Sequence, residues 1–101
     1  MSASDKLGGY ATAFGALDAA GIAANVTADY KLLDQNGKVI TKKDLPGYID
    51  GLKKVGKKMD ITNVMVDGNM AWCKWQVGKV VGAGLITFGD KGVSQEQLFY
   101  F

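Results

Sequence analysis

The side chains that this chain lacks restrict its chemistry more than those it contains. All twelve cationic residues are lysines, so the sequence has neither arginine nor histidine. Imidazole therefore cannot serve within this chain as a general base, nucleophile or metal ligand. A two-pronged guanidinium contact to carboxylate or phosphate is excluded in the same way. Any catalysis must use Asp, Glu, Tyr, Lys or Cys side chains, and we expect no metal site and no cofactor.

The single thiol is a weak candidate for a nucleophile. Cys73 stands between Trp72 and Lys74 in a stretch typical of a β-strand. A reactive cysteine needs a neighbouring base or a helix N-terminus that lowers its pKa. Because the chain has no histidine, the sequence favours a buried structural thiol. A lone cysteine also excludes an intramolecular disulfide.

The charged residues indicate no obligate polyanionic partner. Twelve cations and ten anions leave a formal charge of +2, and they are spread along the chain. We therefore expect no nucleic-acid and no membrane partner. Lys53, Lys54, Lys57 and Lys58 could attract an anion, but we interpret them as a solvated face that complements a negative helix end. Without a spanning segment or a secretory signal, a cytoplasmic protein is expected.

The first half of the chain carries the helical periodicity. Its 101 residues suit one domain, residues 1–101. An apolar stripe at spacings of three and four predicts a first helix with Ser4 as its N-cap: Leu7, Tyr10, Phe14 and Leu17. Residues 22–26 suit one short helical turn. A second helix is expected to begin at Asp44, in a possible capping box with Thr41, and to stop at Gly56.

Strand signals occupy the rest of the sequence. Residues 30–34 alternate as a short strand does, and the Asn36-Gly37 pair predicts the tight turn that follows. From Ile61 onward, turns separate four segments rich in β-branched and aromatic residues: Ile61–Val66, Met70–Val77, Val80–Phe88 and Val93–Phe101. These four strands predict an antiparallel meander.

This order of elements resembles the nuclear transport factor 2-like superfamily, which includes ketosteroid isomerases and SnoaL-like polyketide cyclases. The resemblance lies in VTADYKLLDQNGKVI, ITNVMVDGNMAWCKW and LITFGDKGVSQEQLFYF, and it covers nearly the whole chain. It implies an α+β fold: a cone-shaped, curved antiparallel sheet with two to three N-terminal helices packed on its concave face. A profilin-like fold is the alternative, but that fold would usually end in a packed helix.

The resemblance also supplies a candidate acid. Within DYKLLDQNG, Asp34 matches the proton-shuttling aspartate of the ketosteroid isomerases, and a partly desolvated carboxylate there could take a proton alpha to a carbonyl. The alternative is that Asp34 only binds backbone amides of the turn. The isomerase oxyanion donors would fall near Ala13 or Phe14 and near Gly84, where no side chain can donate. Tyr10 could substitute in a shifted register, but ketosteroid isomerase activity is not expected.

Two functional hypotheses follow. The first is a small-molecule-binding or weakly catalytic domain whose apolar pocket has Asp34 as its acid and seven lining residues: Tyr10, Phe14, Tyr48, Met59, Trp75, Ile86 and Phe99. The second is a non-enzymatic homodimerisation or protein-interaction module that uses the outer face of the sheet, with Trp72, Lys74 and Gln76. Trp72 and Trp75 must face opposite sides of their strand. Gly82 and Gly84 leave space for a ligand or for a close-packed side chain.

Overall fold

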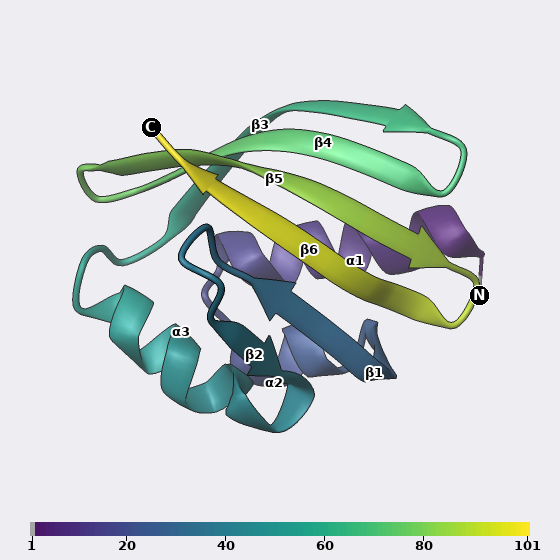
Figure 1. Ribbon diagram of the computed structural model, residues 1–101, viewed down its shortest axis with the longest axis horizontal. Helices are drawn as coiled ribbons and strands as arrows, with labels where there is room; N and C mark the ends of the chain where they lie inside the picture. The colour runs from purple at the N-terminus through teal and green to yellow at the C-terminus, as the bar shows by residue number, and fades with distance from the viewer. Residues whose placement is uncertain (1) are drawn as a thin grey trace.

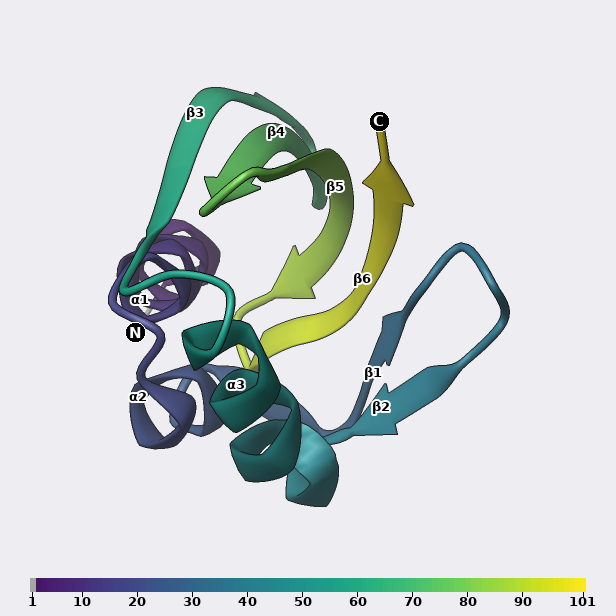
Figure 2. The same cartoon turned by 90° about the vertical axis from the view of Figure 1, so that its left-hand side faces the viewer.

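A computed structural model describes residues 2–101 as one curved sheet with helices inside its curve (Figures 1 and 2). Three α-helices precede the last four strands: α1 (Ala3–Gly15), α2 (Ala19–Ala23) and α3 (Leu45–Lys53). Between α2 and α3 lie β1 (Val26–Leu33), β2 (Val39–Thr41) and the 3-10 turn η1 (Lys42–Asp44). The chain then forms β3 (Met59–Asp67), β4 (Met70–Val77), β5 (Val80–Gly89) and β6 (Gly92–Tyr100).

The four-stranded meander is confirmed, but the complete sheet is mixed rather than wholly antiparallel. The strand order is β2-β1-β6-β5-β4-β3, and the final strand β6 pairs in parallel with β1. This pairing joins the last strand to the first, which the sequence pattern alone cannot reveal. Because Gly92–Tyr100 forms a central strand of the sheet rather than a packed helix, the profilin-like alternative is wrong.

The sheet curls strongly, as Figure 2 shows. Pairing between β3 and β4 slips between Thr62 and Met65, where Asn63 adopts a positive φ of 55°. A second slip interrupts the β5–β6 ladder between Thr87 and Phe88. Such bulges bend the bulged strand and increase the local twist. The curvature creates the concave face on which α1 packs against β3, β5 and β6.

Helix α1 begins two residues earlier than expected. Ser2, not Ser4, is the N-cap: its hydroxyl accepts the Asp5 amide at 3.3 Å, and the Asp5 carboxylate accepts the Ser2 amide at 3.4 Å. This reciprocal box requires an acid three residues after the cap, a condition that Ser2 meets and Ser4 does not. Three residues of the predicted apolar stripe, Leu7, Tyr10 and Phe14, are buried on α1. Leu17 is also buried, but it follows the end of the helix and adopts a positive φ of 51°.

The second long helix also starts with a capping box. The Asp44 carboxylate accepts the Thr41 amide at 3.1 Å and the Thr41 hydroxyl at 2.8 Å, but the box initiates η1. Asp44 is the N-cap residue of α3, as predicted, although its side chain makes no capping bond to that helix. The helix ends at Lys53, before Gly56, whose amide still bonds to the Leu52 carbonyl at 3.1 Å.

Across residues 2–101, no helix is both long enough and apolar enough to cross a membrane.

Candidate functional site

A cavity of about 320 Å³ lies between the concave face of the sheet and helices α1 and α3. Most of its walls are aliphatic and aromatic, supplied by both helices and by strands β3 to β6. A few polar groups interrupt this apolar lining, namely those of Ser4, Tyr10, Tyr48, Cys73, Trp75, Glu96 and Tyr100. A mostly apolar hollow with a few convergent polar groups is the usual form of a small-molecule site.

Six of the seven residues predicted to line the pocket do so: Tyr10, Phe14, Tyr48, Met59, Trp75 and Ile86. Phe99 does not, because it points to the outer face of β6, where its ring lies 6.0 Å from that of Trp72. Side chains alternate along a strand, so the neighbours of Phe99 take the inner positions instead. Leu98 and Tyr100 line the cavity from there.

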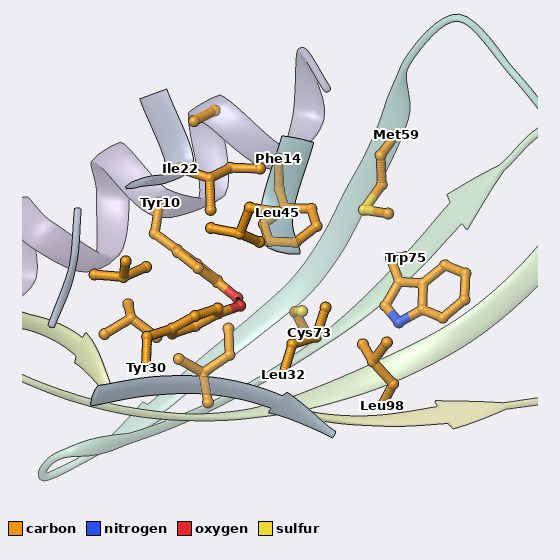
Figure 3. Close-up of a cluster of buried hydrophobic side chains, with 14 of the residues drawn as sticks. Tyr10, Phe14, Ile22, Tyr30, Leu32, Leu45, Met59, Cys73, Trp75 and Leu98 are labelled. Atoms are coloured by element: carbon orange, nitrogen blue, oxygen red, sulfur yellow. Dashed lines mark hydrogen bonds between the residues drawn. The ribbon is translucent and has the colours of Figure 1, made fainter. Parts of the chain in front are cut away.

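Glu96 is the buried acid of the cavity, and the sequence analysis did not single it out. It is only 5% exposed. The Tyr10 hydroxyl donates to its Oε1 at 2.5 Å, and the Tyr10 and Tyr30 hydroxyls lie 2.6 Å apart (Figure 3). Its alternation with Leu98 and Tyr100 along β6 is the signal that could have identified it, since all three point inward.

The environment of Glu96 moves its titration close to neutral pH. Burial raises the pKa of Glu96 to about 7, against the opposing effect of the hydrogen bond from Tyr10. Burial removes water that would otherwise stabilise the carboxylate. Within residues 2–101, the one ion pair closer than 4 Å joins Lys58 to Asp60 on the surface. Glu96 therefore lies in the cavity with a hydroxyl donor but without a paired cation.

Two glycines of β5 make room for the polar groups of the cavity. A side-chain carbon at Gly84 would collide with Glu96 Oε2, and one at Gly82 would collide with the Trp75 indole. Of the two interpretations of these glycines, close packing is therefore the correct one. The space that they leave is occupied by an acid and by an indole.

The Trp75 indole presents an unpaired donor. Trp75 is 5% exposed, and its buried Nε1 has no hydrogen-bond partner among the described residues. The ring packs edge-on against Tyr100 at 5.5 Å, and Figure 3 shows its nitrogen turned toward Leu98. A buried N–H without a partner is costly, and this nitrogen has almost no exposed surface, so the folded chain carries that cost itself.

Cys73 is the buried thiol that the sequence predicts. Burial, with a smaller contribution from the charge of Glu96, raises its pKa to about 12. The thiol therefore stays protonated at physiological pH, which makes it a poor nucleophile.

Asp34 lies in the turn between β1 and β2. Its Oδ1 accepts the amides of Asn36 and Lys38, each at 2.9 Å, and Gly37 adopts a φ of 85° as the turn requires. As far as the structure describes the chain, Asp34 is not among the residues that line the cavity. The geometry matches the turn role that the sequence analysis left open.

The outer face of the sheet carries the side chains that the sequence analysis proposed for homodimerisation or protein interaction. Trp72, Lys74 and Gln76 alternate with buried residues of β4 and point away from the helices, as their spacing predicts. Large apolar side chains are exposed at nearby positions, including Met65 at 62% and Phe101 at 74%.

Comparison with known proteins identifies the fold. No protein-family model matches this sequence, and no curated protein matches it significantly. Solved structures do match, and one is an NTF-2 like protein of unknown function from Burkholderia xenovorans, 15% identical, with a TM-score of 0.76 over 96% of this chain and 80% of that one. The second is an uncharacterised cystatin fold protein from Novosphingobium aromaticivorans, 13% identical, with a TM-score of 0.77 and 98% of each chain covered.

A third similar structure is a putative polyketide cyclase from Sinorhizobium meliloti, with 17% identity, a TM-score of 0.76 and 93% of each chain covered. At these identities the likeness establishes the fold alone. The chain thus has the cone-shaped α+β fold of the nuclear transport factor 2-like and cystatin-like proteins.

Proposed function

Starting from this cone fold, we propose that the chain binds a small apolar molecule that carries one hydrogen-bonding group. The observation that supports this most directly is an apolar cavity of about 320 Å³ with the buried carboxyl group of Glu96 in its wall. The apolar walls favour a hydrophobic ligand, and the carboxyl group favours a polar atom on it that can form a hydrogen bond.

A weak acid–base activity is compatible with the same cavity. Glu96, with its pKa near 7, can gain or lose a proton next to a bound ligand. We therefore assign the candidate acid–base role to Glu96 rather than to Asp34. Glu96 lines the cavity, whereas the Asp34 carboxylate binds the amides of its own turn.

The binding proposal is tested by filling the cavity. Ala11 of α1 lines the cavity, and the neighbouring Thr12 is exposed on the same helix. We expect 2-phenylethanol to raise the melting temperature of the wild type and of Thr12→Phe, but not of Ala11→Phe, because bound ligand stabilises only a protein with room for it. Fluorescence of Trp75 in a Trp72→Phe background reports the same binding. A wild type that no aromatic or alicyclic alcohol stabilises would contradict the proposal.

A second role is favoured by the outer face of the sheet. We propose that this face pairs with a second copy of the chain to form a homodimer. Trp72 and Phe99 pack together there, beside the exposed side chain of Met65 on the edge strand β3. Burying this apolar surface against its own copy would remove it from water at both sites at once.

A further inference from the structure

We propose that the natural ligand of the cavity is an apolar amine, bound as an ammonium ion by the carboxylate of Glu96. This inference rests on the proposed binding function and names the chemical class of the ligand.

The first support is the incomplete pairing of the carboxylate. Tyr10 donates to Oε1, whereas Oε2 lies over the backbone of Gly84 with no donor among the described residues. A buried carboxylate is usually paired with a cation or with several donors. An ammonium group has several N–H donors and a positive charge, so it supplies what this site lacks.

The second support is the chemistry of the walls. Aromatic rings from α1, α3, β4 and β6 surround the cavity: Tyr10, Phe14, Tyr48, Trp75 and Tyr100. The faces of aromatic rings attract cations, an effect that grows in a desolvated site. None of the twelve lysines lines the cavity in the part of the chain that the structure describes. The aromatic walls and the carboxylate thus favour the same sign of charge.

The third support is that the groups facing Glu96 remain neutral. Burial raises the pKa of Tyr10 on α1, of Tyr30 on β1 and of Tyr48 on α3 above the ordinary tyrosine value. Burial likewise raises the pKa of Cys73 on β4 to about 12. Between pH 5 and 9, Glu96 is therefore the group that changes charge around the ligand.

The test compares amines with neutral molecules of the same shape. The probes are 2-phenylethylamine and cyclohexylamine, their alcohols 2-phenylethanol and cyclohexanol, and the anion phenylacetate, with Kd measured by Trp75 fluorescence. At pH 8 we expect each amine to bind roughly tenfold or more tightly than its alcohol, as a charge-assisted hydrogen bond allows. Phenylacetate should bind most weakly.

Dependence on pH gives a readout in the wild-type protein. The amine binds the ionised carboxylate, so its affinity should rise roughly tenfold per pH unit from pH 5 to 7 and then stay level to pH 9, because alkyl ammonium groups keep their proton up to about pH 10. The affinity of the alcohols should not rise over this range. Glu96→Gln should lose the preference for amines but retain alcohol binding, whereas Asp50→Asn, on the exposed side of α3, should change neither.

The outcomes separate the two proposals. Alcohols that bind as tightly as amines, or an amine affinity that does not change with pH, would overturn the assignment of an amine and leave the binding function intact. Failure of every probe to bind would overturn both. If Glu96→Gln does not fold, as judged by circular dichroism, the pH series on the wild type still decides.

Discussion

Glu96 and Gly84 depend on each other across neighbouring strands. The carboxylate occupies the space above Gly84, which exists only because that residue has no side-chain carbon. Strand interiors rarely favour glycine, since it weakens a strand and often marks the close approach of another group. At the scale of single residues, the one acid that lines the cavity among the described residues therefore depends on the glycine that accommodates it.

Substitution of this glycine should disturb the acid. In Gly84→Ala the new carbon would displace Glu96 Oε2, and we expect a loss of roughly 1–3 kcal/mol in the free energy of unfolding from the overpacked site. The control is Gly51→Ala in α3, where a side-chain carbon meets no atom within 4 Å and the helix should gain about 0.5–1 kcal/mol. Urea denaturation measures both, and equal effects of the two changes would refute this account of Gly84.

Burial of Glu96 should also make stability depend on pH. Its pKa is about 7 in the folded protein against an ordinary value of 4.5, so between these two values the folded state binds more protons than the unfolded state. Stability should therefore be highest at the acidic end of this window and fall by roughly 3 kcal/mol as the pH rises to 7 and just beyond.

The matched variant isolates this effect. Glu96→Gln cannot ionise, so its free energy of unfolding should lack the decline that the wild type shows between pH 5 and 7. Urea denaturation at pH 5, 6, 7 and 8 measures the difference in the free energy of unfolding between the wild type and Glu96→Gln. Contributions from the other carboxyl groups cancel in this difference, because both proteins contain them. Parallel pH profiles for the two proteins would mean that Glu96 is not desolvated in the folded state.

At the scale of elements, two side chains hold the turn between β1 and β2. Asp34 accepts two backbone amides within the turn, and Gln35 Oε1 accepts the Tyr100 amide of β6 at 2.8 Å. In the strand order, β2 lies at the edge of the sheet beside β1. Asp34 therefore stabilises this edge locally, whereas Gln35 joins the turn to β6.

Removal of that carboxylate should lower stability without affecting binding. We expect Asp34→Ala to lose about 1 kcal/mol per hydrogen bond. Asp34→Asn keeps an acceptor oxygen and should be close to the wild type. Urea denaturation and the Kd for 2-phenylethanol provide the measurements. If Asp34→Asn retained stability but lost ligand binding or a detectable activity, Asp34 would belong to the site after all.

At the scale of the whole molecule, the two faces of the sheet have different surroundings. The concave face, with α1 and α3, encloses the cavity, while the convex face leaves apolar side chains in water. A domain of this size buries a modest share of its surface, so association would add to its stability.

The proposed homodimer predicts a concentration-dependent mass. Light scattering coupled to size-exclusion chromatography should give twice the chain mass of 10.7 kDa at micromolar concentration and above. Phe99→Lys places a charge in the proposed contact and should yield a monomer, whereas Val39→Lys, exposed on β2 at the other end of the sheet, should not. A wild type that stays monomeric at high concentration would exclude this role.

The local pattern of the sequence determined the two longer helices, the meander and most of the cavity wall. The short helix, expected over residues 22–26, lies instead at Ala19–Ala23. Periodicity reports which side of an element is buried, and this placed Tyr10, Phe14 and Trp75 in the interior. The same alternation places Phe99 on the outer face of β6, because its neighbours Leu98 and Tyr100 point inward. The prediction that Phe99 lines the cavity assumed the opposite orientation of this strand. The absence of arginine and histidine limited the chemistry without any structure.

Tertiary structure alone decided which acid serves the cavity. Asp34 and Glu96 are both carboxylates in segments that read as strands from the sequence. Only the parallel pairing of β6 with β1, together with the gap at Gly84, brings Glu96 against Tyr10 and Tyr30. These contacts join residues 20 and 86 positions apart. A local pattern carries no information about such distant partners, whereas burial and pKa depend on them.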